Sequence, residues 1–438
     1  MSVTLPNASL DDALGEARVR YVRANPASHG VHDKACRTMP GGNTRTTLFH
    51  GPFPLAMESG HGGRLRDVDG HDYVDLIGEY SAALYGHSHP AIRAAIDAAL
   101  ARGVNLGAHG AAEARLAQLV CARFPSIELV RFTNSGTEAN LMAVATAKAA
   151  TGRRRVMVMN GGYHGGLMYF GGGGSPVNVP HDYVLARYND LDGTVALIEA
   201  NGPELACIVV EPMLGAGGCI PGTPAFLAAV RDAARRVGAV LIFDEVMTSR
   251  MSAGGRQQLL GIAPDMTTLG KYIGGGMSFG AFGGCADLMA LYDPRRADAL
   301  PHGGTFNNNV LSMAAGHAGL SEVFTPAAAE ALFARGEALR ARLNDAARTA
   351  GIAAQWTGLG SMACVHFGVT GPIASPADLA TEDKAALELF FLDMLHRGFY
   401  LARRGMIALN LMLGDAECEA FAAAWQDFLA ERQPVLPG

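Results

Sequence analysis

Short apolar runs alternate with segments of helical period over much of the chain. The apolar runs have the length and composition of buried parallel strands, and they cover residues 129–132, 156–159, 207–210 and 239–243. Residues 90–103 and 224–237 repeat their apolar side chains at the spacing of one helix face. Strands that alternate with helices predict an α/β domain built on a mostly parallel sheet. We place this large domain at residues 65–321.

The C-terminal part of the chain shows a different order of patterns. Its predicted elements are a long helix over residues 327–349, strands over 362–367 and 406–412, and a last helix over 415–431. Such a mixture indicates a smaller α+β domain. We place this domain at residues 322–438.

Composition narrows the class of protein. The chain has 438 residues, of which 49% are hydrophobic and 17% are charged, and this is enough for two domains with large cores. A formal net charge of -6 offers no basic surface for nucleic acid, and Arg153–Arg155 is interpreted as a solvated helix end. No apolar run approaches the roughly 20 residues of a membrane helix. We therefore expect neither a nucleic-acid partner nor a membrane segment.

Cysteine usage points to a reducing compartment. The seven cysteines form no CxxC pair, and their odd number argues against a disulfide framework. Residues 1–17 contain acids and lack the basic stretch before an apolar core that marks a secretory signal. The sequence therefore predicts a cytoplasmic protein, and no metal site is predicted.

Lys271 stands in an apolar, glycine-rich segment that is a poor place for a solvated ammonium group. Desolvation lowers the pKa of a lysine amine, which then becomes nucleophilic and can form a Schiff base with an aldehyde such as that of pyridoxal phosphate (PLP). The alternative is a surface lysine beside a flexible loop. The surrounding motifs decide between these interpretations.

Asp244 directly follows the apolar run 239–243. In open α/β sheets, ligands bind at the carboxyl ends of the strands. A carboxylate that faces the pyridine nitrogen of PLP keeps that nitrogen protonated, so the ring can accept electrons. A helix-capping aspartate is the alternative, but Lys271 follows one loop later, and the pair favours a PLP site.

A third motif, Thr133–Asn140, connects a predicted strand to a predicted helix. Free backbone N–H groups at a helix N-terminus bind anions, which suits the PLP phosphate. Ser135 and Thr137 can add hydroxyl donors beside Gly136. Ser135 is also a good helix cap, with Glu138 completing a capping box, and both interpretations can hold for one turn.

These motifs resemble those of class III aminotransferases, which have the PLP fold type I. The motifs that carry the resemblance are Ser135–Ala139, Gly162–Gly165, Phe243–Val246 and Leu269–Lys271, and they occur in the family's order. The resemblance covers nearly the whole chain and is closest to the branch of glutamate-1-semialdehyde aminomutases and aromatic β-amino acid aminotransferases. The segments most similar to the β-amino acid enzymes are Met39–Arg45, Gly270–Gly284 and Gly304–Asn309.

The resemblance implies roles for further residues. Tyr163 would stack on the pyridine ring, and Met247 would pack against the ring's other face. Thr305 would reach the phosphate bound in the partner subunit, so a homodimer is expected. Residues 1–64 would join the small domain. Many relatives have a glutamine where this chain has Leu214, and leucine cannot donate that glutamine's hydrogen bond to the cofactor.

Two arginines match positions where relatives meet substrate. Arg45 lies in a glycine-rich segment and Arg404 precedes the last predicted strand. A guanidinium group suits a carboxylate because it forms paired hydrogen bonds. Both arginines match the carboxylate-binding arginines of the β-amino acid enzymes, whereas aminomutases carry an acidic residue near the second position. The sequence does not assign either arginine to one carboxylate.

We therefore expect a PLP-dependent aminotransferase that moves an amino group from an amino acid, in particular an aromatic β-amino acid, to a 2-oxo acid such as 2-oxoglutarate. Lys271 would hold PLP and then act as acid and base. An aminomutase-like isomerase is the alternative, with the same cofactor chemistry inside one substrate. A PLP-binding protein without turnover is disfavoured, because Lys271 and Asp244 are both present.

Overall fold

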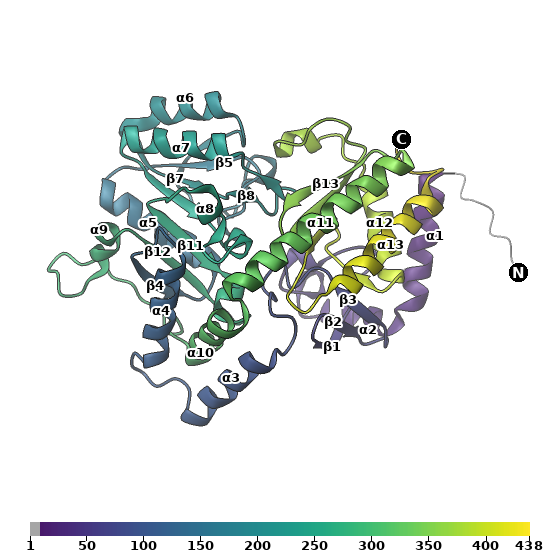
Figure 1. Cartoon of the computed structure of the whole chain (residues 1–438), viewed down its shortest axis with the longest axis horizontal. Coiled ribbons are helices and arrows are strands. Elements are labelled where there is room, and N and C mark those ends of the chain that lie inside the picture. Colours follow the sequence, from purple (N-terminus) through teal and green to yellow (C-terminus); the bar gives the residue numbers. More distant parts are fainter. Residues whose placement is uncertain (1–8) are drawn as a thin grey trace, which may run out of the picture.

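A seven-stranded sheet forms the centre of the larger part of the molecule, which lies on the left in Figure 1. The computed structural model describes residues 9–438. The strand order is β4-β12-β11-β10-β7-β5-β6. The strands are β4 (Leu129–Thr133), β5 (Arg155–Met159), β6 (Asp182–Ala186), β7 (Leu205–Val210), β10 (Val240–Asp244), β11 (Met266–Gly270) and β12 (Gly280–Gly284). Only β12 pairs antiparallel with its neighbours, so the prediction of a mostly parallel sheet is confirmed.

Helices cover both faces of this sheet. They are α3 (Pro90–Arg102), α4 (Ala111–Arg123), α5 (Gly136–Thr151), α6 (Leu191–Asn201), α7 (Pro224–Val237), α8 (Gly255–Leu260), α9 (Ala286–Met289) and α10 (Val310–Ala318). Successive side chains of a strand point to opposite faces. Accordingly, Val156 and Val158 of β5 pack in one apolar cluster with α5, and Met157 and Met159 pack in another with α6 and α7. The core therefore has two apolar layers, one on each side of the sheet.

The helix α7 shows why the predicted elements form where they do. The Thr223 hydroxyl accepts a hydrogen bond from the backbone N–H of Phe226 at 3.2 Å, and Pro224 occupies the first turn. Gly238 ends the helix in the left-handed conformation, with φ of 67°. A glycine adopts this conformation without the steric cost that a side chain brings. These local signals fix α7 at the predicted residues.

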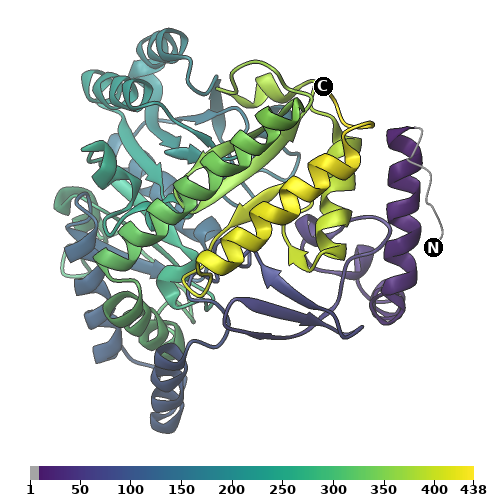
Figure 2. The ribbon, with the colours of Figure 1, turned by 45° about the vertical axis from the view of Figure 1, so that its right-hand side comes forward.

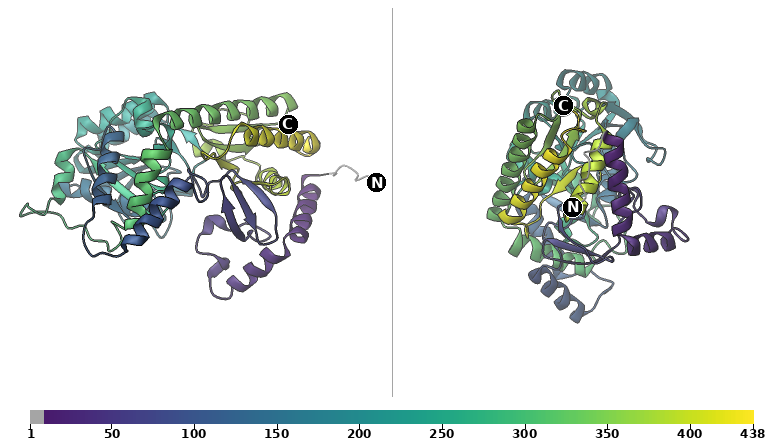
Figure 3. Two further views of the ribbon diagram at one scale, coloured as in Figure 1. Left: turned by 60° about the horizontal axis from the view of Figure 1, so that its bottom comes forward. Right: turned by 90° about the vertical axis from the view of Figure 1, so that its right-hand side faces the viewer.

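Two smaller sheets lie in the other part of the molecule. Their strands are β1 (Met57–His61), β2 (Arg64–Asp67), β3 (Asp72–Asp75) and β15 (Phe399–Tyr400) in one sheet, and β13 (Ala354–Leu359), β14 (Met362–Phe367) and β16 (Met406–Ala408) in the other. The helices here are α1 (Leu10–Ala24), α2 (Pro26–Ala35), α11 (Pro326–Ala350), α12 (Lys384–His396) and α13 (Asp415–Arg432). Figure 2 shows α11 and α13 side by side, and Figure 3 shows α1 beside the C-terminal part, where it packs on α12.

The N-terminal strands pair with a C-terminal strand. β3 runs parallel to β15, with Val74 opposite Phe399. The N-terminal part of the sheet that contains β15 therefore extends beyond residue 64, because β2 and β3 belong to that sheet. The division into two domains stays a prediction, and we propose to move its first boundary to the end of β3.

Two strand predictions need correction. The predicted strand 406–412 ends at Ala408, and the chain then leaves β14, since Leu411 donates its backbone N–H group to Leu84 at 2.8 Å. The sequence analysis also missed β6, β11 and β12 of the central sheet, and β12 contains three glycines. A Cβ atom on Gly283 would lie only 2.7 Å from a methyl group of Ile127, so the strand needs a small residue there. Glycine-rich strands lack the apolar signal by which strands are predicted.

Candidate active site

Lys271 lies one residue beyond β11, at the sheet edge where β10 and β4 also end. Its backbone is left-handed, with φ of 55°, an uncommon conformation for a residue with a side chain. Its side chain lines a cavity of about 480 Å³. Burial lowers the pKa of the Lys271 amine to about 8, against the opposing effect of Asp244 and Glu211. An amine of lowered pKa therefore faces the cavity, and the role of Lys271 as the PLP-binding lysine stays a prediction.

Asp244 ends β10 and also lines this cavity, with only 4% of its surface exposed. Its Oδ2 atom accepts a hydrogen bond from Asn140 Nδ2 at 2.8 Å and lies 2.8 Å from His164 Nδ1. Thr268 in turn donates to Asn140 Oδ1 at 2.7 Å. These contacts hold the carboxylate in one orientation.

The buried charges around Asp244 are coupled. Burial acts to lower the pKa of His164, but the hydrogen bond and charge of Asp244 outweigh it and raise that pKa. Burial raises the pKa of Glu211 to about 7, although His164 and two backbone N–H groups act against this rise. The Glu211 carboxylate accepts these N–H groups from Tyr163 at 2.8 Å and Gly215 at 2.9 Å. His164 therefore lies among acidic groups that favour its protonated form.

Sequence reasoning missed three of these groups as site residues. Asn140 and His164 lie inside motifs that the sequence analysis singled out, and Glu211 directly precedes Pro212. Their residue types carry no sign of which way the side chain points. The strand order brings β10 between β11 and β7 and so places all of them near Asp244.

The residues of the predicted anion site lie at the start of α5. Ser135 caps the helix by accepting the N–H of Glu138 at 3.2 Å, and the Glu138 carboxylate accepts the N–H of Asn134 at 2.8 Å. The backbone N–H groups of the first turn have no partner within a helix, and Gly136 and Thr137 line the cavity. A helix N-terminus therefore opens into the cavity beside Lys271.

A glycine allows a neighbouring loop to close over this turn. A Cβ atom on Gly165 would lie 2.7 Å from the Cα atom of Thr137, a separation that real Cβ atoms do not adopt. Gly165 has φ of 108°, which also requires glycine. The motif that contains Tyr163 and His164 therefore packs directly against the anion site.

Tyr163 and Met247 both line the cavity, as their predicted roles require. Tyr163 is 43% exposed, so its ring is open to a bound molecule. Leu214 has a different position: it is fully buried in the apolar cluster beneath α6 and α7 and does not line the cavity. The position of Leu214 therefore gives no support to the expected effect on a hydrogen bond to the cofactor.

Thr305 does not line the Lys271 cavity of its own chain. It lines a separate cavity of about 370 Å³ together with residues 105–109. Asn307 from the same loop accepts a hydrogen bond from Asn134 at 2.9 Å, so the loop lies beside the anion site. The predicted contact of Thr305 with the phosphate of a partner subunit stays a prediction.

The two predicted substrate arginines meet at one aromatic ring. The guanidinium carbon of Arg45 lies 5.4 Å from the ring centre of Tyr80, and that of Arg404 lies 5.2 Å from it. Arg45 lines the Lys271 cavity, whereas Arg404 lines a neighbouring cavity of about 360 Å³ that also contains Tyr80. Both charges lower the pKa of Lys271, after burial, which is the main cause.

The arginines differ in their partners. Arg45 forms an ion pair with Glu79. Arg404 donates to the sulfur of Met406 at 3.0 Å, and its Nε atom is buried without a hydrogen-bond acceptor. Within residues 9–438, no carboxylate lies at ion-pair distance from Arg404, although its neighbour Arg403 pairs with Glu388. Of the two predicted substrate arginines, Arg404 is therefore the one without a carboxylate partner in the described residues.

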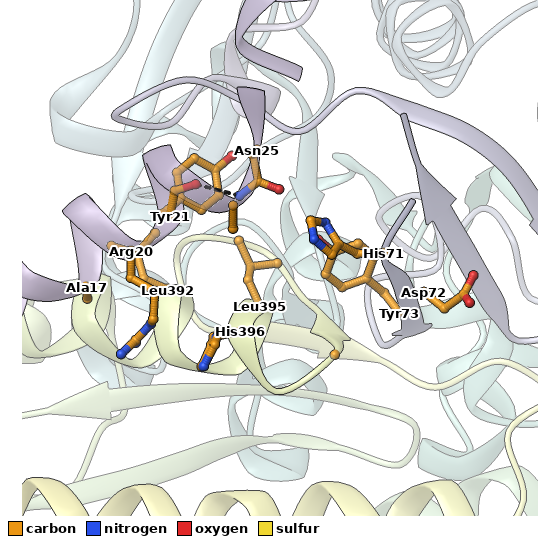
Figure 4. A pocket seen from close by; sticks show the side chains of 12 residues that line it. Ala17, Arg20, Tyr21, Asn25, His71, Asp72, Tyr73, Leu392, Leu395 and His396 are labelled. Carbon is orange, nitrogen blue, oxygen red and sulfur yellow. Dashed lines mark hydrogen bonds between the residues drawn. The ribbon is translucent and has the colours of Figure 1, made fainter. Parts of the chain in front are cut away.

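A further cavity of about 240 Å³ lies between α1, β3 and α12, as Figure 4 shows. Tyr21, Asn25, His71 and Leu395 are among its lining residues. In the described part of the chain it shares no lining residue with the Lys271 cavity. We assign it no part in the chemistry of Lys271.

The Lys271 cavity fits PLP by the chemistry of its groups. It contains an amine of lowered pKa, a buried carboxylate and the N-terminus of a helix. PLP has an aldehyde that reacts with an amine, a ring nitrogen that pairs with a carboxylate, and a phosphate that binds at helix N-termini. The cavity therefore matches all three parts of the cofactor.

Comparison with known proteins decides the family. The model of the family "Aminotransferase class-III" matches residues 49–382. The chain belongs to the class III aminotransferases. It is 52% identical to the beta-phenylalanine transaminase of Variovorax paradoxus over 433 residues, which cover 99% of each protein. The crystal structure described as a novel beta-phenylalanine aminotransferase from Variovorax paradoxus superposes with a TM-score of 0.96 at 53% identity, and the match covers 98% of this chain and 99% of that one.

Other relatives are less similar. A glutamate-1-semialdehyde 2,1-aminomutase of Sorangium cellulosum is 38% identical over 393 residues, which cover 86% of this chain and 89% of that protein. A structure described as a transaminase with PLP bound has a TM-score of 0.84 at 31% identity and is matched over 98% of its length and 93% of this chain. The predicted family, fold type and class of PLP-dependent transaminase are thus confirmed. The cofactor of this aminotransferase is PLP.

Proposed function

We propose that this class III aminotransferase moves the amino group of an aromatic β-amino acid to a 2-oxo acid such as 2-oxoglutarate. The observation that carries the proposal is a pair of arginines over one tyrosine ring, of which Arg45 lines the cavity of Lys271 and Arg404 lines the neighbouring cavity. Two guanidinium groups suit a reaction in which one substrate has one carboxylate and the other has two. The 52% identity to a beta-phenylalanine transaminase supports an aromatic β-amino acid as the donor.

Lys271 and Asp244 have the central roles in this proposal. When bound, PLP supplies an aldehyde that binds amino groups and a ring that accepts the electrons of the broken bond. Lys271 Nζ would hold the cofactor, and would then move a proton from the amino-bearing carbon of the donor to the carbon that carried the cofactor's aldehyde. A pKa of about 8 suits an amine that must both accept and donate a proton near neutral pH. The Asp244 carboxylate, held by Asn140 and His164, stabilises the positive charge of the ring nitrogen.

Other cavity residues bind and orient the cofactor in this proposal. Tyr163 and Met247 enclose the ring, because both side chains line the cavity. The N-terminus of α5 binds the phosphate through Gly136 and Thr137, with Ser135 as cap. Thr305 of the partner subunit completes this phosphate site.

The two arginines divide the substrate carboxylates. Arg404 has no carboxylate partner in the described residues, so we assign it the carboxylate that both substrates have. Arg45 already has Glu79 as a partner, so we assign it the additional carboxylate of a dicarboxylate 2-oxo acid.

A comparison of donors tests the proposed function. We expect racemic β-phenylalanine to transfer its amino group to 2-oxoglutarate much faster than racemic α-phenylalanine does at equal concentration. The measurement is glutamate formation with the holoenzyme and each donor. Equal or faster transfer from α-phenylalanine would contradict the assignment of a β-amino acid donor.

The aminomutase alternative makes a different prediction. An isomerase needs one substrate and no acceptor, whereas a transaminase stops after one amino group per active site when no acceptor is present. This test matters because the chain is also 38% identical to an aminomutase. We expect product formation from β-phenylalanine alone to end at about one equivalent, since each site then holds the amino group.

The lowered pKa of Lys271 predicts the pH dependence of cofactor attachment. Only the neutral amine attacks an aldehyde, and burial lowers the pKa of Lys271 from the usual 10.5 to about 8. The amine is therefore protonated below pH 8 and neutral above it. We expect the rate at which cofactor-free enzyme attaches PLP to rise with pH up to about 8 and then to level off.

Stopped-flow absorbance checks this expectation, with Nα-acetyl-lysine amide as the control amine. The rate with the control amine should continue to rise above pH 10. If the rate for the enzyme rose in parallel with the control, Lys271 would not have a lowered pKa.

A homodimer is the proposed active form, because Thr305 completes the phosphate site only from a second chain. Losing a hydrogen bond to a charged group costs about 1 to 3 kcal/mol. We therefore expect Thr305→Ala to weaken PLP retention by up to about two orders of magnitude while the dimer persists. Light scattering and dialysis against cofactor-free buffer measure the two properties, and a fully active monomer would refute the proposal.

The protein's location is a separate proposal. All seven cysteines are free thiols in the structure. Free thiols persist in reducing compartments, so we propose a cytoplasmic enzyme. In residues 9–438, no helix combines the length and the apolar composition needed to cross a membrane.

A further inference from the structure

The turn that contains Tyr80 has an unusual backbone. Four consecutive residues from Gly78 to Ser81 have positive φ, with values of 53°, 49°, 53° and 75°. Only glycine adopts this left-handed region without a steric cost, and such strain concentrates at functional sites. The buried carboxylate of Asp75 holds the turn by accepting the N–H groups of Ile77 at 3.0 Å and Gly78 at 2.9 Å. The fold thus maintains a costly conformation at this point.

The turn presents two side chains to the substrate arginines. The Glu79 carboxylate forms an ion pair with Arg45, and both line the cavity that contains Lys271. The ring of Tyr80 lies under the guanidinium groups of Arg45 and Arg404. The Tyr80 hydroxyl donates to the carbonyl oxygen of Thr47 at 2.9 Å, which fixes the ring. Neighbouring residues of one turn therefore contact both arginines.

An anion beside Arg45 solves a problem of the proposed reaction. An aromatic β-amino acid has a single carboxylate, which Arg404 takes in our proposal. The guanidinium group of Arg45 would then face an apolar side chain without an anion from the substrate. Glu79 supplies the missing carboxylate from within the protein.

We propose that Glu79 is a specificity-determining residue. Its carboxylate pairs with Arg45 while a substrate with one carboxylate is bound, and the distal carboxylate of a dicarboxylate 2-oxo acid displaces it. This inference rests on the proposed function, because it requires that one site accept both kinds of substrate. Glu79 thereby lowers the affinity for the dicarboxylate and keeps the site suited to the apolar donor.

The exposure of the pair sets the size of the effect. The side chains of Arg45 and Glu79 are 43% and 56% exposed, so water screens their attraction. Exposed ion pairs stabilise proteins only weakly. Releasing Arg45 from Glu79 should therefore improve dicarboxylate binding by about two- to fivefold.

The test compares a dicarboxylate with a monocarboxylate acceptor. The enzyme is first prepared in its amino form by reconstituting cofactor-free protein with pyridoxamine phosphate, so the result does not depend on any amino donor. The single-turnover reaction is then followed with 2-oxoglutarate or with pyruvate. We expect Glu79→Gln to lower the apparent Kd for 2-oxoglutarate about two- to fivefold and to leave that for pyruvate unchanged.

A matched control removes a charge elsewhere. Glu419 lies on the exposed face of α13, so Glu419→Gln makes the same chemical change far from the cavity. It should leave both acceptors unchanged. If the ratio of the two Kd values for Glu79→Gln equalled that of this control, or if 2-oxoglutarate bound more weakly, the inference would be overturned.

A double substitution identifies the partner of Glu79. In an Arg45→Ala background, Glu79→Gln should no longer change the ratio of the two Kd values, because the charge that Glu79 occupies is gone. A persisting change would overturn the assignment. Failure of the proposed function appears separately, as the absence of amino transfer from β-phenylalanine to the wild-type enzyme.

Discussion

Lys271→Ala is expected to abolish turnover and covalent attachment of PLP while the fold persists. The amine is the only group of the cavity assigned both to hold the cofactor and to move the proton, so no neighbour replaces it. General acid–base catalysis contributes about two to four orders of magnitude, and loss of covalent attachment adds to this. The rate of glutamate formation should therefore fall by at least about a thousandfold.

The control for this variant is Lys34→Ala, on the exposed surface of α2. It should retain the visible absorbance of the lysine-bound cofactor and wild-type rates. Thermal unfolding of Lys271→Ala should be compared with cofactor-free wild type, because a bound cofactor itself raises stability. Substantial transamination by Lys271→Ala would show that another residue is the catalytic lysine.

Arg404→Ala is expected to have the second largest effect, because it removes the arginine that we assign to the carboxylate common to both substrates. Loss of an arginine that holds a desolvated carboxylate costs about 2 to 5 kcal/mol, which is about thirty- to several-thousand-fold in affinity. Both half-reactions should weaken. Arg45→Ala should weaken the half-reaction with 2-oxoglutarate more than the one with β-phenylalanine, because Arg45 serves only the additional carboxylate.

Single-turnover measurements of each half-reaction separate these cases. Arg403→Ala is a matched control, because Arg403 is adjacent in sequence but pairs with Glu388 and is 50% exposed. It should stay near wild type in both half-reactions. Near-wild-type binding by Arg404→Ala would place the carboxylate site elsewhere.

The sequence predicted Asp244 from the apolar run before it, and Lys271 from its apolar, glycine-rich segment one loop later. Asp244 follows a clear apolar run, and Lys271 follows the next strand of the sheet. The strand before Lys271, β11, was not among the predicted strands, and the structure shows that it runs parallel to β10 and ends at the same edge of the sheet. The geometry confirms that Lys271 and Asp244 line the same cavity.

The groups that orient Asp244 could not be predicted in the same way. Asn140 is on a helix and His164 is in a loop, and only the folded chain brings both to one carboxylate oxygen. The burial of Leu214 in an apolar cluster could not be predicted for the same reason, since a motif position does not say which way a side chain points. The role proposed for Glu79 depends on a left-handed turn. Glycines are the usual sequence sign of such a turn, and three of its four residues are not glycine.

The most direct measurement of the central claim follows the nitrogen atom. ¹⁵N-labelled β-phenylalanine is incubated with the wild-type holoenzyme and unlabelled 2-oxoglutarate, and the products are analysed by mass spectrometry. The account predicts ¹⁵N in glutamate, with one labelled glutamate formed for each donor consumed. Label that remains in a rearranged form of the donor's own carbon skeleton, with none in glutamate, would contradict it.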